Sequence, residues 1–187
     1  MNKFLILIVL TLIVSCKKNT PNEKIAEELK SFYGQTITFP DELKNISDES
    51  PDFKDYACPK SYKIIAYIDS ADCTPCTLQS FALWKNFTEK LEQSDAELII
   101  ILKSGPNPEI QETFNFYDMH FPAFINPKGD FKIENHLPTS TLLHTFLLDK
   151  NNQVAFVGSP IQNENSWQLF QKVISQLNTH NGILPPR

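Results

Sequence analysis

Glycine is scarce in this sequence, with 5 among 187 residues, although proline (13) and phenylalanine (14) are plentiful. So little glycine excludes collagen-like and glycine-rich low-complexity chains. The sequence also has no run of lysine and arginine, and its formal net charge is −5. Because binding phosphates requires a basic face, these features exclude nucleic acid as a partner. With 41% hydrophobic residues and 21% charged residues, the chain suits one globular domain with a buried core.

Closely spaced metal-ligand pairs are nearly absent as well. The sequence has four cysteines and four histidines, but it holds one C-x-x-C pair and no H-x-x-x-H pair. A four-ligand zinc site would need two more ligands beside that single pair. We therefore predict no structural zinc site. We also expect no organic cofactor, because another dithiol protein would supply the electrons.

Residues 1–15 have the pattern of a secretory signal peptide. Lys3 is followed by an apolar stretch over residues 4–14 that only Thr11 interrupts. This stretch is shorter than the roughly 20 residues that a membrane-spanning helix needs, and it fits the apolar part of a signal peptide. It ends in Ile-Val-Ser-Cys at residues 13–16, which resembles the bacterial lipobox. The resemblance implies that Cys16 becomes a lipid-modified N-terminus; the alternative is an uncleaved signal anchor.

The domain organisation follows from this N-terminus. We expect a lipid-anchored tether over residues 16–22 and a folded domain over residues 23–180, of which 23–60 form an N-terminal extension. The lipid would attach the protein to a membrane, and the domain would lie outside the cytoplasm on the periplasmic side of the bacterial cell envelope. Disulfides can persist in that compartment.

Hydrophobic periodicity predicts an α/β fold with a mixed central sheet. Helices are expected over residues 22–33, 77–91, from 108 onward and 166–177, and strands over 35–39, 62–68, 97–103 and 121–126. Residues 145–149 and 153–157 flank a short polar segment and predict a β-hairpin. The acidic segment 40–55 is expected to be a solvated loop, and the tail 182–187 to be frayed.

The C-x-x-C pair lies between a predicted buried strand and an amphipathic helix. Cys73-Thr74-Pro75-Cys76 follows the strand 62–68 and precedes the helix 77–91. At the start of a helix, free N–H groups and the helix dipole stabilise a thiolate, which is the attacking form of cysteine. This favours Cys73 as a nucleophile and Cys76 as the thiol that resolves a mixed disulfide.

The segment YKIIAYIDSADCTPCTLQSFALWKNF resembles the active-site strand, motif and helix of the thioredoxin superfamily. The segments MHFPAFINPKGD and HTFLLDKNNQVAFVG resemble its membrane-anchored TlpA-like branch, and the chain is similar to lipid-anchored thioredoxin-like proteins of Bacteroidetes. The resemblance covers about residues 62–177. It implies a three-layer α/β/α sandwich with a helix–strand insert, and a thiol:disulfide oxidoreductase that exchanges electrons with dithiol or disulfide proteins.

The sequence departs from the family pattern at three places. The family's cis-proline position aligns with Leu143, the tryptophan before the first cysteine is Asp72, and the buried acid is Tyr67. Because a neighbouring like charge raises a thiol's pKa, Asp72 opposes the Cys73 thiolate. We therefore expect a redox-active dithiol that differs from a general thioredoxin. The residues expected to support it are Thr74, Pro75, Leu143, His144 and Thr145.

Other interpretations remain for some of these residues. The dithiol could be a silent structural disulfide in a docking domain. It could also join His144 in a metal carrier, because two thiolates and an imidazole suit copper(I). Cys58 could be a buried small residue or a second resolving thiol. Asp69 could relay protons to the dithiol or simply be a solvent-facing carboxylate.

Overall fold

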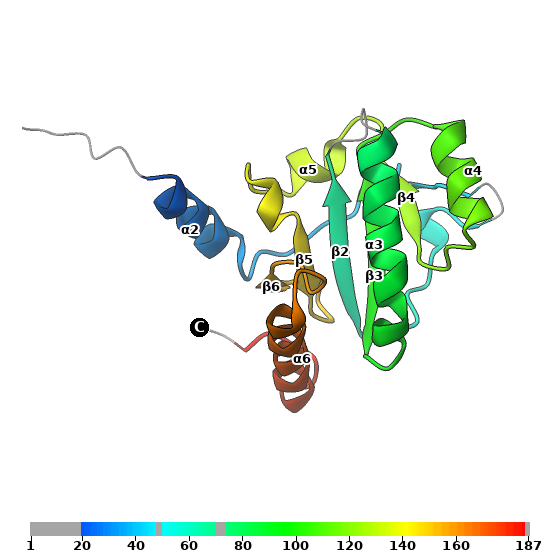
Figure 1. Cartoon of the computed structure of the whole chain (residues 1–187). Coiled ribbons are helices and arrows are strands. Elements are labelled where there is room, and N and C mark those ends of the chain that lie inside the picture. Colours follow the sequence, from blue (N-terminus) through cyan, green and yellow to red (C-terminus); the bar gives the residue numbers. More distant parts are fainter. Residues whose placement is uncertain (1–19, 48–49, 70–73, 186–187) are drawn as a thin grey trace, which may run out of the picture.

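The computed structural model describes residues 20–47, 50–69 and 74–185 (Figure 1). The predicted signal peptide, Cys16 and most of the tether lie outside these ranges, as do Asp72 and Cys73. In the described part of the chain, no helix is long and apolar enough to cross a membrane.

One mixed sheet of six strands forms the centre of the domain, in the order β1-β4-β3-β2-β5-β6. The parallel strands are β2 (Tyr62–Ile68), β3 (Ala96–Leu102) and β4 (Ala123–Ile125). The strands β5 (Thr145–Leu148), β6 (Val154–Val157) and β1 (Lys44–Asn45) pair antiparallel to their neighbours. The predicted mixed sheet, its two central strands and the hairpin are confirmed.

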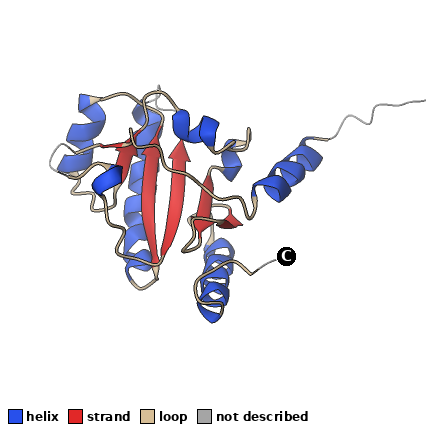
Figure 2. Ribbon diagram, turned by 180° about the vertical axis from the view of Figure 1, so that it is seen from behind, coloured by secondary structure: helices blue, strands red, loops and turns tan. Residues whose placement is uncertain are grey.

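Helices cover one face of the sheet, and a helix with extended chain covers the other. The helices α3 (Thr74–Glu92), α4 (Pro108–Phe116) and α6 (Glu164–Thr179) contribute to one apolar cluster. The opposite cluster contains Phe131 of α5 (Asp130–Glu134), Phe32 of α2 (Pro21–Phe32), and Ile37 and Leu43 between α2 and β1. Figure 2 shows this second face, which the chain after α2 crosses. The arrangement is a three-layer α/β/α sandwich, as the resemblance implied.

The burial of β2 and β3 explains why their sequences are apolar without alternation. Ile64, Ile65, Ile99 and Ile100 are all fully buried, although successive residues of a strand point to opposite faces. Both faces are therefore covered, as is typical of central parallel strands.

The helix α3 is fixed to the sheet by a stripe of large residues. Phe81, Trp84, Phe87 and Leu91 recur at spacings of three to four residues and are buried. Burying each such side chain contributes about 1.5–3 kcal/mol. This stripe fixes α3, whose first turn contains Cys76, against the sheet.

Asp149 organises the β5–β6 turn and the C-terminal tail. Its buried carboxylate accepts hydrogen bonds from the backbone N–H groups of Asn151 and Gln153, both at 2.8 Å, and from that of Leu184 at 2.7 Å. The prediction of a frayed tail is therefore wrong as far as Leu184, because a buried carboxylate holds it.

Two predictions about the N-terminal extension are also wrong. Residues 35–39 form no strand but a single bridge, between Thr36 and Gln153. The segment 40–55 is not a solvated loop throughout, because Leu43 and Ile46 are buried and β1 pairs with β4. Because most of this segment is charged or polar, the sequence pattern did not indicate that these two apolar residues are buried. The segment also contains the short 3-10 helix η1 (Phe53–Asp55).

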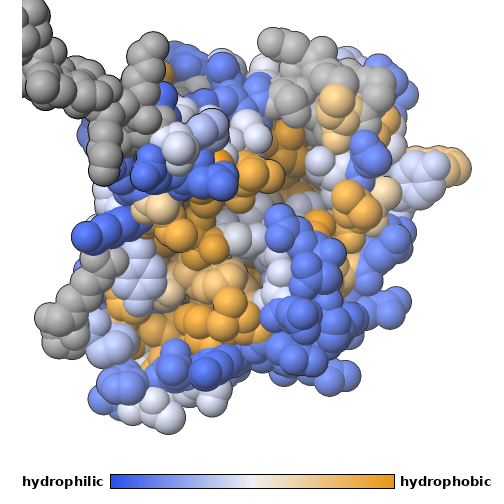
Figure 3. All heavy atoms as spheres, turned by 60° about the vertical axis from the view of Figure 1, so that its left-hand side comes forward, coloured by the Kyte–Doolittle hydropathy of each residue, from blue (hydrophilic) through white to orange (hydrophobic). Residues whose placement is uncertain are grey.

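Partly exposed apolar surface lies on the side of the molecule that carries α2 and β6. Figure 3 shows apolar side chains gathered in a hollowed area there, with hydrophilic residues around it. Figure 1 shows α2 standing away from the sheet, and of its residues only Phe32 is buried.

Candidate active site

The last three residues of the C-x-x-C motif lie at the start of α3. Thr74 and Pro75 are the first two residues of α3, and Cys76 is the third. Cys76 is exposed and disulfide-bonded. Cys58, the other cysteine within the described ranges, is free, so the partner of Cys76 lies outside them. The backbone thus gives Cys76 the helix-start position that the sequence predicted.

Cys76 continues a helix face that borders a cavity. The Ser80 hydroxyl donates a hydrogen bond to the Cys76 carbonyl oxygen at 3.0 Å. Ser80 and Trp84, four and eight residues after Cys76, line a cavity of about 520 Å³. Since residues four apart lie on the same helix face, Cys76 lies one turn before the α3 residues that line this cavity. The cavity is also lined by Ala66, Tyr67, Ile68, Asp69, Thr141, His144, Thr145, Ser159 and Ile161.

His144 also lines this cavity, but it does not belong to α3. It follows the short 3-10 helix η2 (Thr141–Leu143), precedes β5, and has only 3% of its surface exposed. Its carbonyl accepts the N–H of Tyr67 at 2.9 Å. Its Nε2 lies 2.8 Å from the carbonyl oxygen of Pro138. Because a carbonyl only accepts hydrogen bonds, Nε2 must carry the hydrogen.

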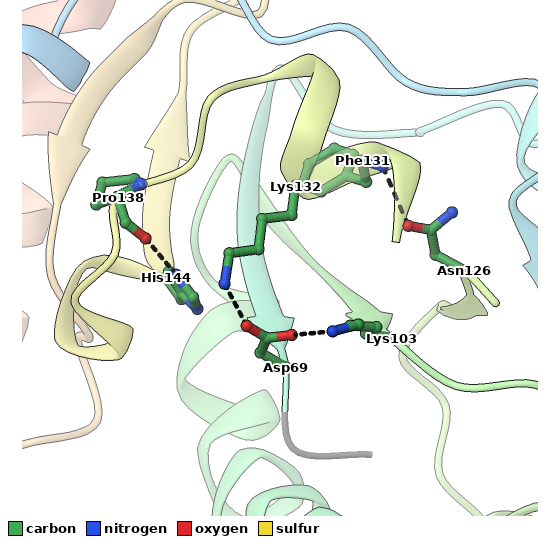
Figure 4. Close-up of polar contacts among 7 residues, drawn as sticks. All are labelled: Asp69, Lys103, Asn126, Phe131, Lys132, Pro138 and His144. Atoms are coloured by element: carbon green, nitrogen blue, oxygen red, sulfur yellow. Dashed lines mark hydrogen bonds and ion pairs between the residues drawn. The ribbon is translucent and has the colours of Figure 1, made fainter. Parts of the chain in front are cut away.

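The other ring nitrogen of His144 has no such partner. Nδ1 is closed off from solvent, and no described residue forms a hydrogen bond with it. It points away from Pro138 in Figure 4. Burial lowers the pKa of His144 below its usual value, so the ring is neutral at pH 7 and Nδ1 holds a free lone pair.

Asp69, at the end of β2, forms ion pairs with two lysines (Figure 4). Its carboxylate forms an ion pair with Lys103 at 3.3 Å and a short contact with Lys132. Burial alone would raise the pKa of Asp69, but hydrogen bonds and charge from the two lysines hold it below the usual range. The interpretation of Asp69 as a solvent-facing carboxylate is therefore wrong. A lowered pKa also makes Asp69 a poor proton relay.

Tyr67 occupies the position of the family's buried acid. It is 4% exposed, its ring stacks on Phe131 with centroids 5.8 Å apart, and no described residue pairs with its hydroxyl. Burial raises the pKa of Tyr67, so the hydroxyl stays protonated. The site therefore has a neutral phenol where the family has a carboxyl group.

The residues aligned with the family's cis-proline loop do lie beside the end of β2. Leu143 is buried at the end of η2, and Thr145 pairs with Ala66 across β5 and β2. Among the described residues no peptide bond is cis. The two backbone segments meet as the resemblance implied, with leucine and histidine in place of proline.

Cys58 lies at the opposite end of β2. Its thiol is half-buried and donates a hydrogen bond to the Glu97 carboxylate at 3.0 Å. Burial and this hydrogen bond raise the pKa of Cys58 to about 11. The seven residues of β2 separate the two cysteines by roughly 20 Å. Cys58 is therefore neither a fully buried residue nor a second resolving thiol.

Sequence reasoning missed Lys103, Lys132 and Ser80. Lys103 could have been found, because it follows the strand parallel to β2, and parallel strands bring their carboxyl ends to one edge. Lys132 and Ser80 gave no signal of this kind. As for metals, no three histidine, cysteine, aspartate or glutamate side chains within the described ranges are grouped to hold an ion.

Known structures share this fold at low sequence identity. Neither a family model nor a curated protein matches the sequence. The C-terminal domain of a protein from Bacteroides thetaiotaomicron named as a thiol-disulfide oxidoreductase is 10% identical, with a TM-score of 0.58 over 79% of this chain and 99% of that one. A thioredoxin-like protein from Porphyromonas gingivalis is 16% identical, with a TM-score of 0.51 over 75% and 92%.

A third similar structure comes from Chlorobium tepidum. It is named as a thiol:disulfide interchange protein DsbE and is 16% identical, with a TM-score of 0.50 over 78% of this chain and 99% of that one. At these identities the comparisons show the fold. The chain has the thioredoxin fold, as the resemblance of its sequence implied.

Proposed function

We propose that this protein is a thiol:disulfide oxidoreductase of the bacterial cell envelope that works through Cys73 and Cys76. The observation that carries the proposal is an exposed, disulfide-bonded Cys76 in the first turn of α3, at the end of the central strand β2. In this proposal Cys73 is its disulfide partner in the oxidised protein. In the reduced protein, Cys73 attacks a client disulfide and Cys76 resolves the mixed disulfide.

The surroundings of the motif support this chemistry. The free N–H groups and the dipole at the start of α3 favour a thiolate there. The adjacent cavity of about 520 Å³ gives a client chain room to approach the motif. The similar structures include proteins named for thiol–disulfide exchange, and their names are consistent with this use of the fold.

We propose further that lipid on Cys16 anchors the protein on the periplasmic side of the envelope. The apolar stretch over residues 4–14 and the lipobox-like Ile-Val-Ser-Cys support a signal peptide over residues 1–15. The helix α2 begins at Pro21, so the tether between lipid and first helix is short. Replacing Cys16 with Ser should abolish incorporation of a labelled fatty acid into the protein; equal labelling of the native protein and C16S would contradict the lipid anchor.

Thiol–disulfide exchange by the full chain tests the activity. The protein is purified in detergent, reduced, and mixed with insulin as a disulfide substrate. We expect that C73S abolishes reduction of insulin and that C76S nearly does so. C58S is the matched control and should leave the rate unchanged. Equal rates for the native protein and C73S would refute the proposal and leave a docking domain with a silent disulfide.

A further inference from the structure

The cavity near Cys76 is lined by a histidine that has one ring nitrogen without a hydrogen-bond partner among the described residues. Three of the described residues that line it are titratable: Tyr67, Asp69 and His144. The phenol of Tyr67 is neutral and holds its proton, and the carboxylate of Asp69 is kept ionised by its ion pairs with Lys103 and Lys132. His144 is the remaining one, with a lone pair on Nδ1.

The backbone fixes which nitrogen of His144 is available. The hydrogen on Nε2 is committed to Pro138, whose carbonyl oxygen lies 2.8 Å away. Nδ1 therefore acts only as an acceptor, yet it is buried and no described residue donates to it. Buried acceptors without a donor are uncommon, and each one calls for an explanation.

Reduction of the disulfide adds a hydrogen donor close to this cavity. Cys76 begins the face of α3 that continues through Ser80 and Trp84, and both of these residues line the same cavity as His144. In the disulfide Cys76 has no S–H group, but in the reduced protein it has one. The Cys76 thiol is then a hydrogen donor one helical turn before Ser80, which lines the cavity that holds the unpartnered acceptor.

We propose that His144 is the base that takes the proton of Cys76 when Cys76 resolves a mixed disulfide. This inference rests on the proposed function and deepens it. It gives a role to the buried imidazole before β5, which the proposed function leaves unassigned. Tyr67, which lines the same cavity, stays protonated.

The charges around His144 are consistent with a neutral base. Lys132 of α5 opposes a positive charge on the imidazole, whereas Asp69 of β2 and Glu28 of α2 favour one. Burial also opposes the charged form. The ring is thus neutral before the step, and the two carboxylates stabilise the imidazolium during it.

The step can be written for an aromatic disulfide, dithiobis-nitrobenzoate. The Cys73 thiolate attacks one reagent sulfur, the reagent's S–S bond breaks, and one nitrothiobenzoate anion leaves. The proton of Cys76 then passes to Nδ1 of His144, and the Cys76 sulfur attacks Cys73. The protein disulfide forms, the mixed disulfide breaks, and a second anion leaves. Two protein sulfurs lose two electrons, the two reagent sulfurs gain them, and His144 releases the proton to solvent.

Rapid mixing with this reagent tests the inference. The full chain, reduced and in detergent, carries Cys16→Ser and Cys58→Ala, so that Cys73 and Cys76 are its two thiols. The first coloured anion reports attack by Cys73, and the second reports resolution by Cys76. His144→Gln keeps a side-chain N–H for the Pro138 carbonyl but cannot accept a proton. The matched control is His120→Gln, since the His120 side chain is 80% exposed.

We expect His144→Gln to leave the first release unchanged and to slow the second at least tenfold at pH 7, because general bases contribute about 100-fold or more. His120→Gln should match the native protein in both phases. If His144→Gln gives both releases at the native rates, the inference is overturned while the proposed function stands. If the native protein itself shows no first release, the proposed function fails.

A second measurement decides the matter if His144→Gln does not fold, which circular dichroism would show. The rate of the second release in the native protein is followed from pH 5 to pH 8. The inference predicts an inflection below about 6.5, the usual histidine value, because protonated His144 cannot act as a base. A rate that rises steadily through this range without an inflection would contradict the inference.

Discussion

The two ends of β2 and α3 each carry a cysteine and a carboxylate, but they treat them differently. At the carboxyl end of β2, Cys76 is exposed in the first turn of α3, and Asp69 is bound by two lysines. At the other end, the Cys58 thiol is half-buried and donates to Glu97. One carboxylate is kept ionised by cations, and the other accepts a hydrogen bond from the thiol itself.

The two ends differ in the features that make a cysteine reactive. A helix start supplies N–H groups and a positive dipole end, which favour a thiolate. The Cys58 end has the opposite character, since α3 ends there and its last carbonyl groups point outward. Lys60 meets these carbonyls, with its Nζ 2.8 Å from the oxygen of Leu91. Position in the fold, rather than residue type, therefore separates the proposed reactive pair from an inert thiol.

The largest expected effect comes from trapping a reaction intermediate. With Cys76→Ser, Cys73 can attack a client disulfide but nothing resolves the product, so a mixed disulfide should accumulate. A non-reducing gel with a disulfide peptide measures it. Cys58→Ser should trap nothing. Equal trapping by both variants would erase the distinction between the two ends.

Alkylation of Cys58 should show the next largest effect. The pKa of about 11 leaves few thiolates at pH 8, so we expect iodoacetamide to modify Cys58 about 100-fold more slowly than an ordinary cysteine. Mass spectrometry of the modified peptide gives the rate. Glu97→Gln should speed modification, because it removes a negative charge that disfavours the thiolate. No change in Glu97→Gln would show that burial alone protects Cys58.

Stability should follow pH at the Cys58 end in a defined direction. The pKa of Cys58 in the folded state lies above its unfolded value of about 8.5. The stabilisation is complete below pH 8.5 and is lost as the pH rises toward about 11. In Cys58→Ala, this part of the alkaline loss should disappear.

Asp69→Asn should destabilise the fold by about 1–3 kcal/mol, because it leaves Lys103 and Lys132 without their shared partner. Urea unfolding at pH 7 measures this free energy. Glu42→Gln is the control, since its pair with Lys128 is exposed and should cost less than about 1 kcal/mol. The pKa of Asp69 is lowered on folding, so its contribution is present above about pH 4 and fades as the pH falls further. A difference that persists at pH 2 would contradict the ion-pair origin.

Lys60→Met should have the smallest effect. It removes the ammonium group that contacts the carbonyls at the end of α3, which we expect to cost about 0.3–1 kcal/mol in urea unfolding. The rate of thiol–disulfide exchange should stay unchanged, because this end lies roughly 20 Å from Cys76. A slower exchange would show that the two ends are coupled through α3.

Local sequence patterns were enough to predict most of the fold. The unbroken apolar runs of β2 and β3, the spacing of Phe81, Trp84 and Leu91, and the polar turn between β5 and β6 each determine their own element. The order of these elements along the chain is that of the thioredoxin fold. The prediction that failed depended on tertiary contacts. Residues 35–39 have strand composition, but they meet the sheet at a single bridge, beside the turn before β6.

The site was only partly predictable for a similar reason. The position of Cys76 follows from the adjacent strand and helix, and Tyr67 and Leu143 follow from alignment with the family. The pairing of Asp69 with Lys132 joins residues far apart in sequence and depends on where α5 lies. The hydrogen bond that selects the tautomer of His144 depends on a turn at Pro138 whose shape no local pattern indicates.

The reduction potential of the proposed Cys73–Cys76 pair distinguishes a redox-active dithiol from a structural disulfide. The full chain is equilibrated in a series of redox buffers at pH 7, and the fraction of thiols is counted after acid quenching and alkylation. A redox-active pair should have a potential above about −300 mV, within the range in which dithiol proteins exchange electrons. A potential below about −300 mV would identify a structural disulfide and contradict the account.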